Sequence, residues 1–244
     1  MRPLVRTAAA ALCTATALGL TAACDTLFDD ARSAAPYARL TGPEVVNKAL
    51  AATRGAKSVR MTVETTSPEG PVEAYVATDI RGECTVTLSM GAAGTMELVR
   101  TGGTVYTQSD AAMLRAVTAP DDPHRNTAAD IKRLTGRWVK PPAGDRHTKP
   151  ALRYCDREVL LGLLAPKSGT ARKGETATLD SGVRTLTVTG RADDGKWTAN
   201  VATDGRPYLM KLHFPQGGAG RNTGPVTVEF SAFDKPFTAR KPKI

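Results

Sequence analysis

Residues able to act as nucleophiles, general bases or metal ligands are few in this chain. It has four cysteines and three histidines, and His124, His147 and His213 are too far apart in sequence to have metal-ligand spacing. The paired aspartates at 121–122 and 193–194 lie among turn-forming residues, where they more often start bends than share a proton. No G-x-S-x-G, S-x-x-K or H-E-x-x-H segment is present. The sequence therefore predicts a protein that is not an enzyme and has no catalytic residue, metal site or cofactor.

One thiol, that of Cys24, follows three small residues at the end of an apolar N-terminal run. Arg2 and Arg6 precede the run. The apolar stretch 8–20 is shorter than the roughly 20 residues of a bilayer-spanning helix. A basic start, a short apolar middle and small residues at the end are typical of a cleavable export signal. Residues 1–23 are therefore predicted to be a signal peptide.

The residues Leu20-Thr21-Ala22-Ala23-Cys24 resemble the lipobox of bacterial lipoproteins. The resemblance implies that the Cys24 thiol receives a diacylglyceryl group and that cleavage makes Cys24 the first residue of the mature chain. Because two or more acyl chains hold a protein on a membrane far longer than one, we expect a lipid-anchored protein on the outer, extracytoplasmic face of the cell membrane. The alternative is ordinary cleavage after Ala23, which would release a secreted protein.

The other cysteines predict one disulfide. Cys13 leaves with the leader and Cys24 is taken by lipid, so Cys84 and Cys155 remain. Two thiols in an oxidising compartment favour a bridge. It would close a loop of about 70 residues and stabilise the fold by roughly 4 kcal/mol in the chain-entropy model. The alternative is two separately buried thiols, because sequence alone does not establish proximity.

The chain is basic, with 33 Lys+Arg against 24 Asp+Glu and a net charge of +9 at pH 7. Such a charge favours contact with anionic headgroups or acidic envelope polymers. The cations are scattered, however, and the only cluster in the sequence is Arg240-Lys241-Lys243, so we interpret them as a solvated basic surface. Aromatic residues make up 5% of the chain and form no stacking motif among the cations, so no nucleic-acid binding is predicted.

The order of apolar residues predicts a tether, a helix and then a sheet. Residues 24–41 are polar and without clear periodicity, and read as a flexible tether between the anchor and a domain at 42–244. Pro43 fits the first position of a helix that ends near Gly55. The period then changes to two, and tight turns separate five strands. These predicted strands lie at 58–66, 72–80, 84–90, 95–101 and 105–106.

Helices are expected in the middle of the chain and strands again at its end. Segments 109–117 and 126–134 begin with the N-cap residues Ser109 and Asn126, and an amphipathic helix is predicted over 155–166. A disulfide to Cys155 would join this last helix to the sheet. Four further strands are predicted at 182–190, 196–202, 207–214 and 225–230. About nine strands with several helices predict an α+β fold with one large, twisted antiparallel sheet.

This layout resembles the actinobacterial LppX/LprG-type lipoproteins, whose fold is similar to that of the LolA/LolB lipoprotein carriers. The segments that carry the likeness are "MELVRTGGTVYTQSD", "GRWVKPP" and "VTVEFSAFDKPFTARKP". The resemblance implies a half-barrel wrapped around a few helices, with an apolar cavity that accepts the acyl chains of a lipid or glycolipid. Its implied function is non-enzymatic binding, by a monomer, at the membrane surface.

The ligand would contact the apolar face of the first strands, where methionines alternate with aliphatic residues. Methionine is pliable and suits apolar ligands of variable shape, although it more often fills gaps in a core. If the same face is fully packed, the alternative is an interaction or sensor lipoprotein that binds an envelope protein through its surface. The candidate ligand-binding residues are Met61, Val63, Val76, Val86, Leu88, Met90, Met96 and Leu98.

Overall fold

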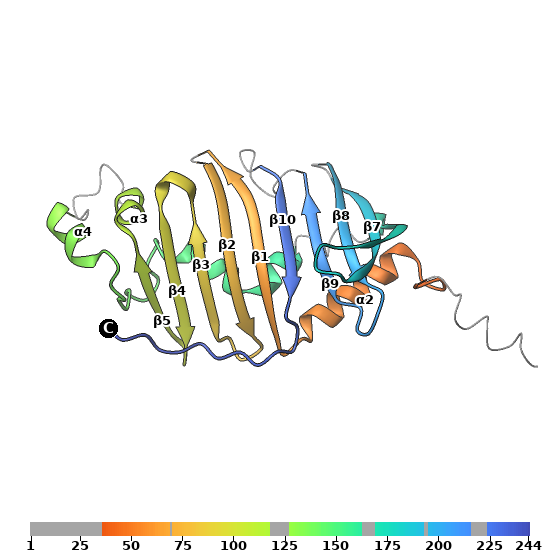
Figure 1. Ribbon diagram of the computed structural model, residues 1–244, viewed down its shortest axis with the longest axis horizontal. Helices are drawn as coiled ribbons and strands as arrows, with labels where there is room; N and C mark the ends of the chain where they lie inside the picture. Colours follow the sequence, from red (N-terminus) through yellow and green to blue (C-terminus); the bar gives the residue numbers. More distant parts are fainter. Residues whose placement is uncertain (1–35, 69, 118–126, 163–168, 193–194, 216–223) are drawn as a thin grey trace, which may run out of the picture. The chain divides into compact units, whose positions relative to one another are not determined.

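The chain divides into two units, Met1–Ala38 and Arg39–Ile244, and the second contains the whole described fold. The computed structural model describes residues 36–68, 70–117, 127–162, 169–192, 195–215 and 224–244 (Figure 1). The predicted signal peptide, Cys24 and most of the predicted tether lie outside these residues.

The second unit is built on one ten-stranded antiparallel sheet with the strand order β5-β4-β3-β2-β1-β10-β9-β8-β7-β6 (Figure 1). Two meanders, β1–β5 and β6–β10, meet where β1 pairs with β10. The expected α+β fold with a large antiparallel sheet is confirmed. The strands are β1 (Ser58–Ser67), β2 (Gly70–Asp79), β3 (Cys84–Ser89), β4 (Thr95–Thr101), β5 (Thr104–Ser109), β6 (Arg172–Thr178), β7 (Arg184–Ala192), β8 (Gly195–Ala202), β9 (Leu209–Phe214) and β10 (Val226–Ser231).

The strand that the sequence did not predict is β6. It lies at one edge of the sheet, all seven of its residues are exposed, and its pairing with β7 shifts register between Lys173 and Thr176. Since neither of its faces is buried in a core, it lacks the alternation of apolar and polar residues that marks the other strands.

The longest helix, α2 (Gly42–Arg54), begins with a capping box in which Thr41 and Glu44 satisfy each other's backbone N–H groups. Its apolar side packs on β8 and β9, and its Thr53 hydroxyl accepts the backbone N–H of Leu209 at 3.0 Å. Figure 1 shows α2 on the far side of the sheet in that view. This helix is the cover of the second meander.

The shorter helices begin one residue later than expected. The N-cap of α3 (Ala111–Ala116) is Asp110 rather than Ser109, which ends β5 by pairing with Met96. The N-cap of α4 (Ala128–Leu134) is Thr127, which forms a capping box with Asp130. Both corrections have one physical cause, because in each case the next residue supplies an oxygen that accepts a first-turn N–H.

Of the helix expected over 155–166, the structure describes only the short helix α6 (Arg157–Gly162). Two further short pieces precede it, α5 (Lys149–Leu152) and the 3₁₀ turn η2 (Arg153–Cys155). Asp156 interrupts them because its backbone is extended, and its carboxylate accepts the N–H of Glu158 at 2.9 Å. Residues 163–166 lie outside the described part.

The apolar stripe expected at Tyr208, Met210, Leu212 and Phe214 is interrupted by a β-bulge. The pairing of β8 with β9 shifts between Asn200 and Val201, so that Met210 is the extra residue. Leu209, Leu212 and Phe214 are therefore the buried ones. The side chain of Tyr208 instead stacks on Phe233, with ring centroids 3.9 Å apart.

The C-terminal segment after β10 runs past the ends of β1 to β4 toward β5 (Figure 1). Ala239 in this segment is buried, and the Lys241 ammonium lies 6.0 Å from the centre of the Tyr106 ring. The outward-facing pair Val99 and Tyr106 is also buried. We infer that the segment covers part of the sheet face opposite the helices.

Candidate functional site

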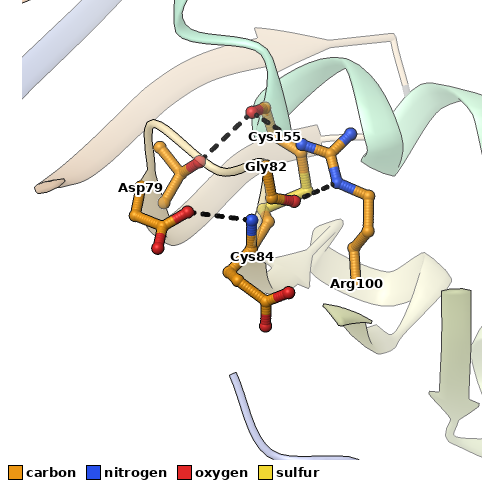
Figure 2. Close-up of a disulfide and its surroundings, with 7 residues drawn as sticks. Asp79, Gly82, Cys84, Arg100 and Cys155 are labelled. Carbon is orange, nitrogen blue, oxygen red and sulfur yellow. Dashed lines mark hydrogen bonds between the residues drawn. A yellow bond between two sulfur atoms is a disulfide. The ribbon is translucent and has the colours of Figure 1, made fainter. Parts of the chain in front are cut away.

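The cover of the first meander is fixed by a disulfide. Cys84 on β3 and Cys155 at the end of η2 are both buried and joined by an S–S bond of 2.10 Å, with their Cα atoms 5.7 Å apart. Figure 2 shows the bond between the strand and the helical segment. Both cysteines lie where the predicted bridge requires them, one on the inward face of the sheet and one on the segment that covers it.

Hydrogen bonds to one carbonyl reinforce this attachment. The Cys155 carbonyl accepts a hydrogen bond from the Thr78 hydroxyl and another from Arg100 Nη2, each at 3.4 Å (Figure 2). Arg100 Nε also donates to the Gly82 carbonyl at 2.6 Å. Because Thr78, Cys84 and Arg100 are cross-strand neighbours on β2, β3 and β4, the three strands hold η2 at one level of the sheet.

The turn between β2 and β3 is organised by the carboxylate of Asp79. It accepts the backbone N–H of Arg81 at 2.9 Å and of Glu83 at 3.0 Å, and the Arg81 guanidinium at 2.8 Å. Burial of this carboxylate acts to raise its pKa, but the hydrogen bonds from Arg81 and from the two backbone N–H groups outweigh burial and lower the pKa below its usual value. This ionised group orders the turn that precedes Cys84.

A second attachment joins α6 to α2. The side chain of Arg157 is buried, and its Nη1 donates to the carbonyls of Thr53, Arg54 and Ala56 at 3.2, 3.4 and 2.7 Å. These are the carbonyls at the end of α2, where a cation is favourable. Burial lowers the pKa of Arg157, and its Nη2 has no hydrogen-bond partner within the described ranges. Sequence reasoning missed this residue, which reads as an ordinary polar position of an amphipathic helix.

Seven of the eight candidate ligand-binding residues form two adjacent rows on the inward face of the first meander. Met61, Val76, Val86 and Leu98 pair across β1 to β4 in one row. The second row consists of Val63, Ala74, Leu88 and Met96. The seven side chains are at most 5% exposed. We call these eight residues the concave rows, and they lie beside the level at which η2 is attached.

The eighth candidate, Met90, lies outside the rows, so its expected place on the inward face is wrong. Its strand ends at Ser89, and Met90 precedes the 3₁₀ turn η1 (Gly91–Ala93). Its backbone N–H donates to the Gly94 carbonyl at 2.9 Å, and the residue is half-buried. Gly91, the first residue of η1, and Gly94, which follows it, have positive φ angles, so the chain turns one residue before the alternation would place Met90 on the sheet.

The opposite, convex face of the sheet carries a groove of about 720 Å³ beside the C-terminal segment. Arg60, Tyr75, Phe237 and Arg240 are among the residues that line it. Tyr75 is 52% exposed, and its hydroxyl donates to Glu73, which raises the pKa of Tyr75. Two residues of the concave rows also border this groove, but their side chains alternate to the other face, so only their backbone is available here.

The histidines do not come together with other metal ligands in the described part of the chain, where no group of three His, Cys, Asp or Glu side chains could hold a metal ion. His213 Nδ1 is 3.0 Å from the Thr227 hydroxyl, and His147 Nε2 accepts from Arg146 at 3.3 Å. His124 and the aspartate pairs 121–122 and 193–194 lie outside the described residues. Across the same ranges, no helix is both long enough and apolar enough to cross a membrane.

Comparison with known proteins identifies solved structures of similar fold. No protein-family model and no curated protein matches the sequence. The solved structure of LprF from Mycobacterium bovis superposes with a TM-score of 0.53 at 16% identity, over 82% of this chain and 96% of that one. The fold is of the LppX/LprG type. A second structure, the MucA/MucB complex of Pseudomonas aeruginosa, matches at a TM-score of 0.33 and 13% identity, over 78% of this chain and 57% of that one.

Proposed function

We propose that this chain is a non-enzymatic lipoprotein, anchored through Cys24 to the outer face of the cell membrane, that holds acyl chains of a lipid or glycolipid against the concave rows. The single observation that carries the proposal is the composition of those rows. All eight residues are aliphatic or methionine, and their cover is attached beside them at the disulfide. The LppX/LprG-type fold and the leader that ends at Cys24 support the same function.

The rows are apolar and buried beneath their cover, so a ligand that displaces the cover would meet a surface suited to hydrocarbon rather than to polar groups. They cross four strands, and at a strand spacing of about 4.8 Å this is roughly 14 Å of continuous apolar surface. Each methylene group transferred from water to such a surface contributes about 0.8 kcal/mol. Met61 and Met96 stand at opposite corners of the rows, where flexible side chains can adapt to an occupant.

The lipid-binding part of the proposal is tested with the exported chain carrying Cys24→Ser, purified from its native host without detergent. We expect lipid to co-purify and to be identified by mass spectrometry after extraction. Val86→Phe should lower the lipid-to-protein ratio because it fills a row, whereas Thr87→Phe, the same replacement at the exposed neighbour, should not. Absence of lipid from the Cys24→Ser protein, together with no uptake of a fluorescent fatty acid, would contradict the proposal.

The anchor is tested separately by detergent phase partition. The chain with Cys24 intact should enter the detergent-rich phase, and Cys24→Ser should move it to the aqueous phase. Equal partition of both forms would remove the anchor from the proposal while leaving the lipid-binding test in force.

A second candidate function is the binding of an envelope protein by a fully packed domain. The observation that favours it is the convex groove, which is lined by an exposed Tyr75 and by the guanidinium groups of Arg60 and Arg240. Aromatic and arginine side chains are enriched in protein interfaces. Under this candidate, Tyr75→Ala would abolish a specific cross-link in intact cells and would leave the lipid content at zero in both forms.

A further inference from the structure

Three cations gather at the corner of the sheet where β6, β7 and β8 meet. Arg172, Arg191 and Lys196 line a hollow of about 670 Å³, together with Gly169, Thr170, Ala171, Thr189 and Gly190. All three side chains are exposed. We call Arg172, Arg191 and Lys196 the corner cluster.

Strand register brings the three charges to one face. Arg191 lies directly opposite Lys196 across β7 and β8, and Arg172 lies opposite Thr189, which is two residues before Arg191 on the same face. Like charges directly opposite each other on a sheet destabilise it. The backbone at Arg191 is nevertheless held in place, because the Thr170 hydroxyl donates to its carbonyl at 2.9 Å and accepts its N–H at 3.1 Å.

The cluster has no counter-ion among the residues that the structure describes. Within the described ranges, no hydrogen bond or ion pair involves the side chains of its three residues, in contrast to the surface pairs Lys211–Glu229 and Arg54–Glu158. Three positive charges around one hollow, with no acid paired to them among the described residues, form an electrostatic site for an anion. Guanidinium groups in particular match the geometry of phosphate oxygens.

The cluster also lies where the predicted tether joins the domain. A Cβ atom added at Gly42, the first residue of α2, would be 2.2 Å from the carbonyl oxygen of Ala171, so the start of α2 packs on the residue before Arg172. In Figure 1 the beginning of α2 and the β7 side of the sheet lie at the same end. The predicted tether comes directly before α2 in the sequence. An anchor at Cys24 would therefore tend to keep this corner close to the bilayer.

We propose that the corner cluster binds the phosphate groups of anionic phospholipids in the membrane that holds the anchor, and so orients the domain with its β6 edge toward the bilayer. The inference rests on the proposed anchor for its biological setting, but the binding chemistry belongs to the cluster alone. Tethering raises the effective concentration of headgroups, so individually weak contacts suffice.

The experiment measures sedimentation of the exported Cys24→Ser chain with vesicles of phosphatidylcholine, with and without about one third phosphatidylglycerol. We expect binding to the anionic vesicles only. Because each cation near an anionic surface contributes on the order of 1 kcal/mol, replacing Arg172, Arg191 and Lys196 by Gln together should weaken binding roughly 100-fold. Added salt should weaken it as well. Asp193 and Asp194, which follow β7 in sequence, stay unchanged in every variant.

A matched control removes the same charge from the other edge of the sheet. Lys132, Arg137 and Lys140 are exposed and lie in α4 and the segment that pairs with β5 through Val139. Their triple Gln variant should bind anionic vesicles within about threefold of the parent. Equal weakening by both triple variants would overturn the proposal, because it would show a response to total charge. Binding of inorganic phosphate by the corner cluster without any binding to anionic vesicles would overturn the membrane assignment.

The outcome is independent of the lipid cargo and of the acyl anchor. Vesicle binding uses a chain that has no anchor, and the Gln variants leave the concave rows untouched. If lipid fails to co-purify but the corner variants lose vesicle binding, the proposed function fails and the cluster stands. The reverse pattern refutes the cluster alone.

Discussion

The two meanders of the sheet bury their inward faces by different means. The second meander is filled by aromatic rings, with Trp197, Phe214 and Phe230 all buried at 3% exposure or less, and α2 packs on β8 and β9. The concave rows of the first meander contain no aromatic residue, and their cover is short helical pieces attached through one disulfide and one arginine. Large rings give a rigid core, whereas aliphatic and methionine side chains can rearrange. The second meander is therefore the more rigid half, and the proposed ligand site lies on the first.

The largest expected effect is on the scaffold half. Trp197 is fully buried, and a Cβ atom added at Gly190 would be 2.2 Å from its ring, so the ring packs directly on the backbone of β7 and its removal would leave a cavity there. Trp197→Ala should lower the free energy of unfolding by about 3–5 kcal/mol, measured by urea denaturation. Tyr75→Ala, at a half-exposed position of the first meander, should change it by less than about 0.5 kcal/mol. Similar losses of unfolding free energy for the two substitutions would mean that the Trp197 ring is not central to the stability of the second meander.

Removal of the disulfide should affect mainly the first meander. Replacing Cys84 and Cys155 together by Ser should destabilise the chain by roughly 2–5 kcal/mol, because the bridge spans 71 residues. Hydrogen exchange should increase in η2, β2 and β3, where the covering segment is attached, and should stay unchanged in β8 and β9. A uniform increase in exchange over both meanders would show that the sheet opens as one unit and would weaken the distinction between them.

Much of this fold follows from local patterns, and the exceptions have physical causes. Strands with one buried face alternate apolar and polar residues, so nine of the ten were predicted. The edge strand β6 buries neither face, and its residues carry no alternation. Beside the bulge at Met210, the backbone N–H of Leu209 bonds to Thr53 in a distant helix. A contact between segments so far apart leaves no mark on the local period.

The candidate site divides in the same way. Seven of the eight residues predicted to contact a ligand share one face because strand periodicity alone determines which face they take. Arg157 could not be found, because its role depends on the carbonyl end of α2 arriving beside it. The corner cluster was missed for a related reason. Its cations stand on three different strands, so the only cluster visible in the sequence was the one at the C-terminal tail.

Breaking the contact between the two covering helices, α2 and α6, should lower the free energy of unfolding by less than the Trp197 or the disulfide substitutions. Arg157→Met removes the side-chain donor to three carbonyls at and just after the end of α2 and should cost about 1–3 kcal/mol in the free energy of unfolding. Arg54→Met removes only the exposed pair with Glu158 and should cost less than about 1 kcal/mol. If the proposal for the concave rows is right, Arg157→Met should also speed the exchange of bound lipid, and Arg54→Met should not. If bound lipid exchanged at the same rate in both variants, lipid would enter the domain at a place other than the α2–α6 contact.

The smallest expected effect is a pH dependence confined to the β2–β3 turn. The pKa of Asp79 is lower in the folded chain than the unfolded value of about 3.9. The ionised carboxylate therefore contributes stability that is fully present above about pH 4 and is lost as the pH falls through the folded pKa. Unfolding of the parent and of Asp79→Asn, compared from pH 7 to pH 2, should show a stability difference that shrinks only in the acid range. The amide of the Asp79→Asn variant cannot ionise and accepts through one oxygen only. A stability difference between parent and variant that stays the same at pH 2 would therefore mean that Asp79 acts through its hydrogen-bonding geometry rather than through its charge. In that case the attachment of Cys84 would not depend on pH, and the first meander would keep its cover under acid conditions.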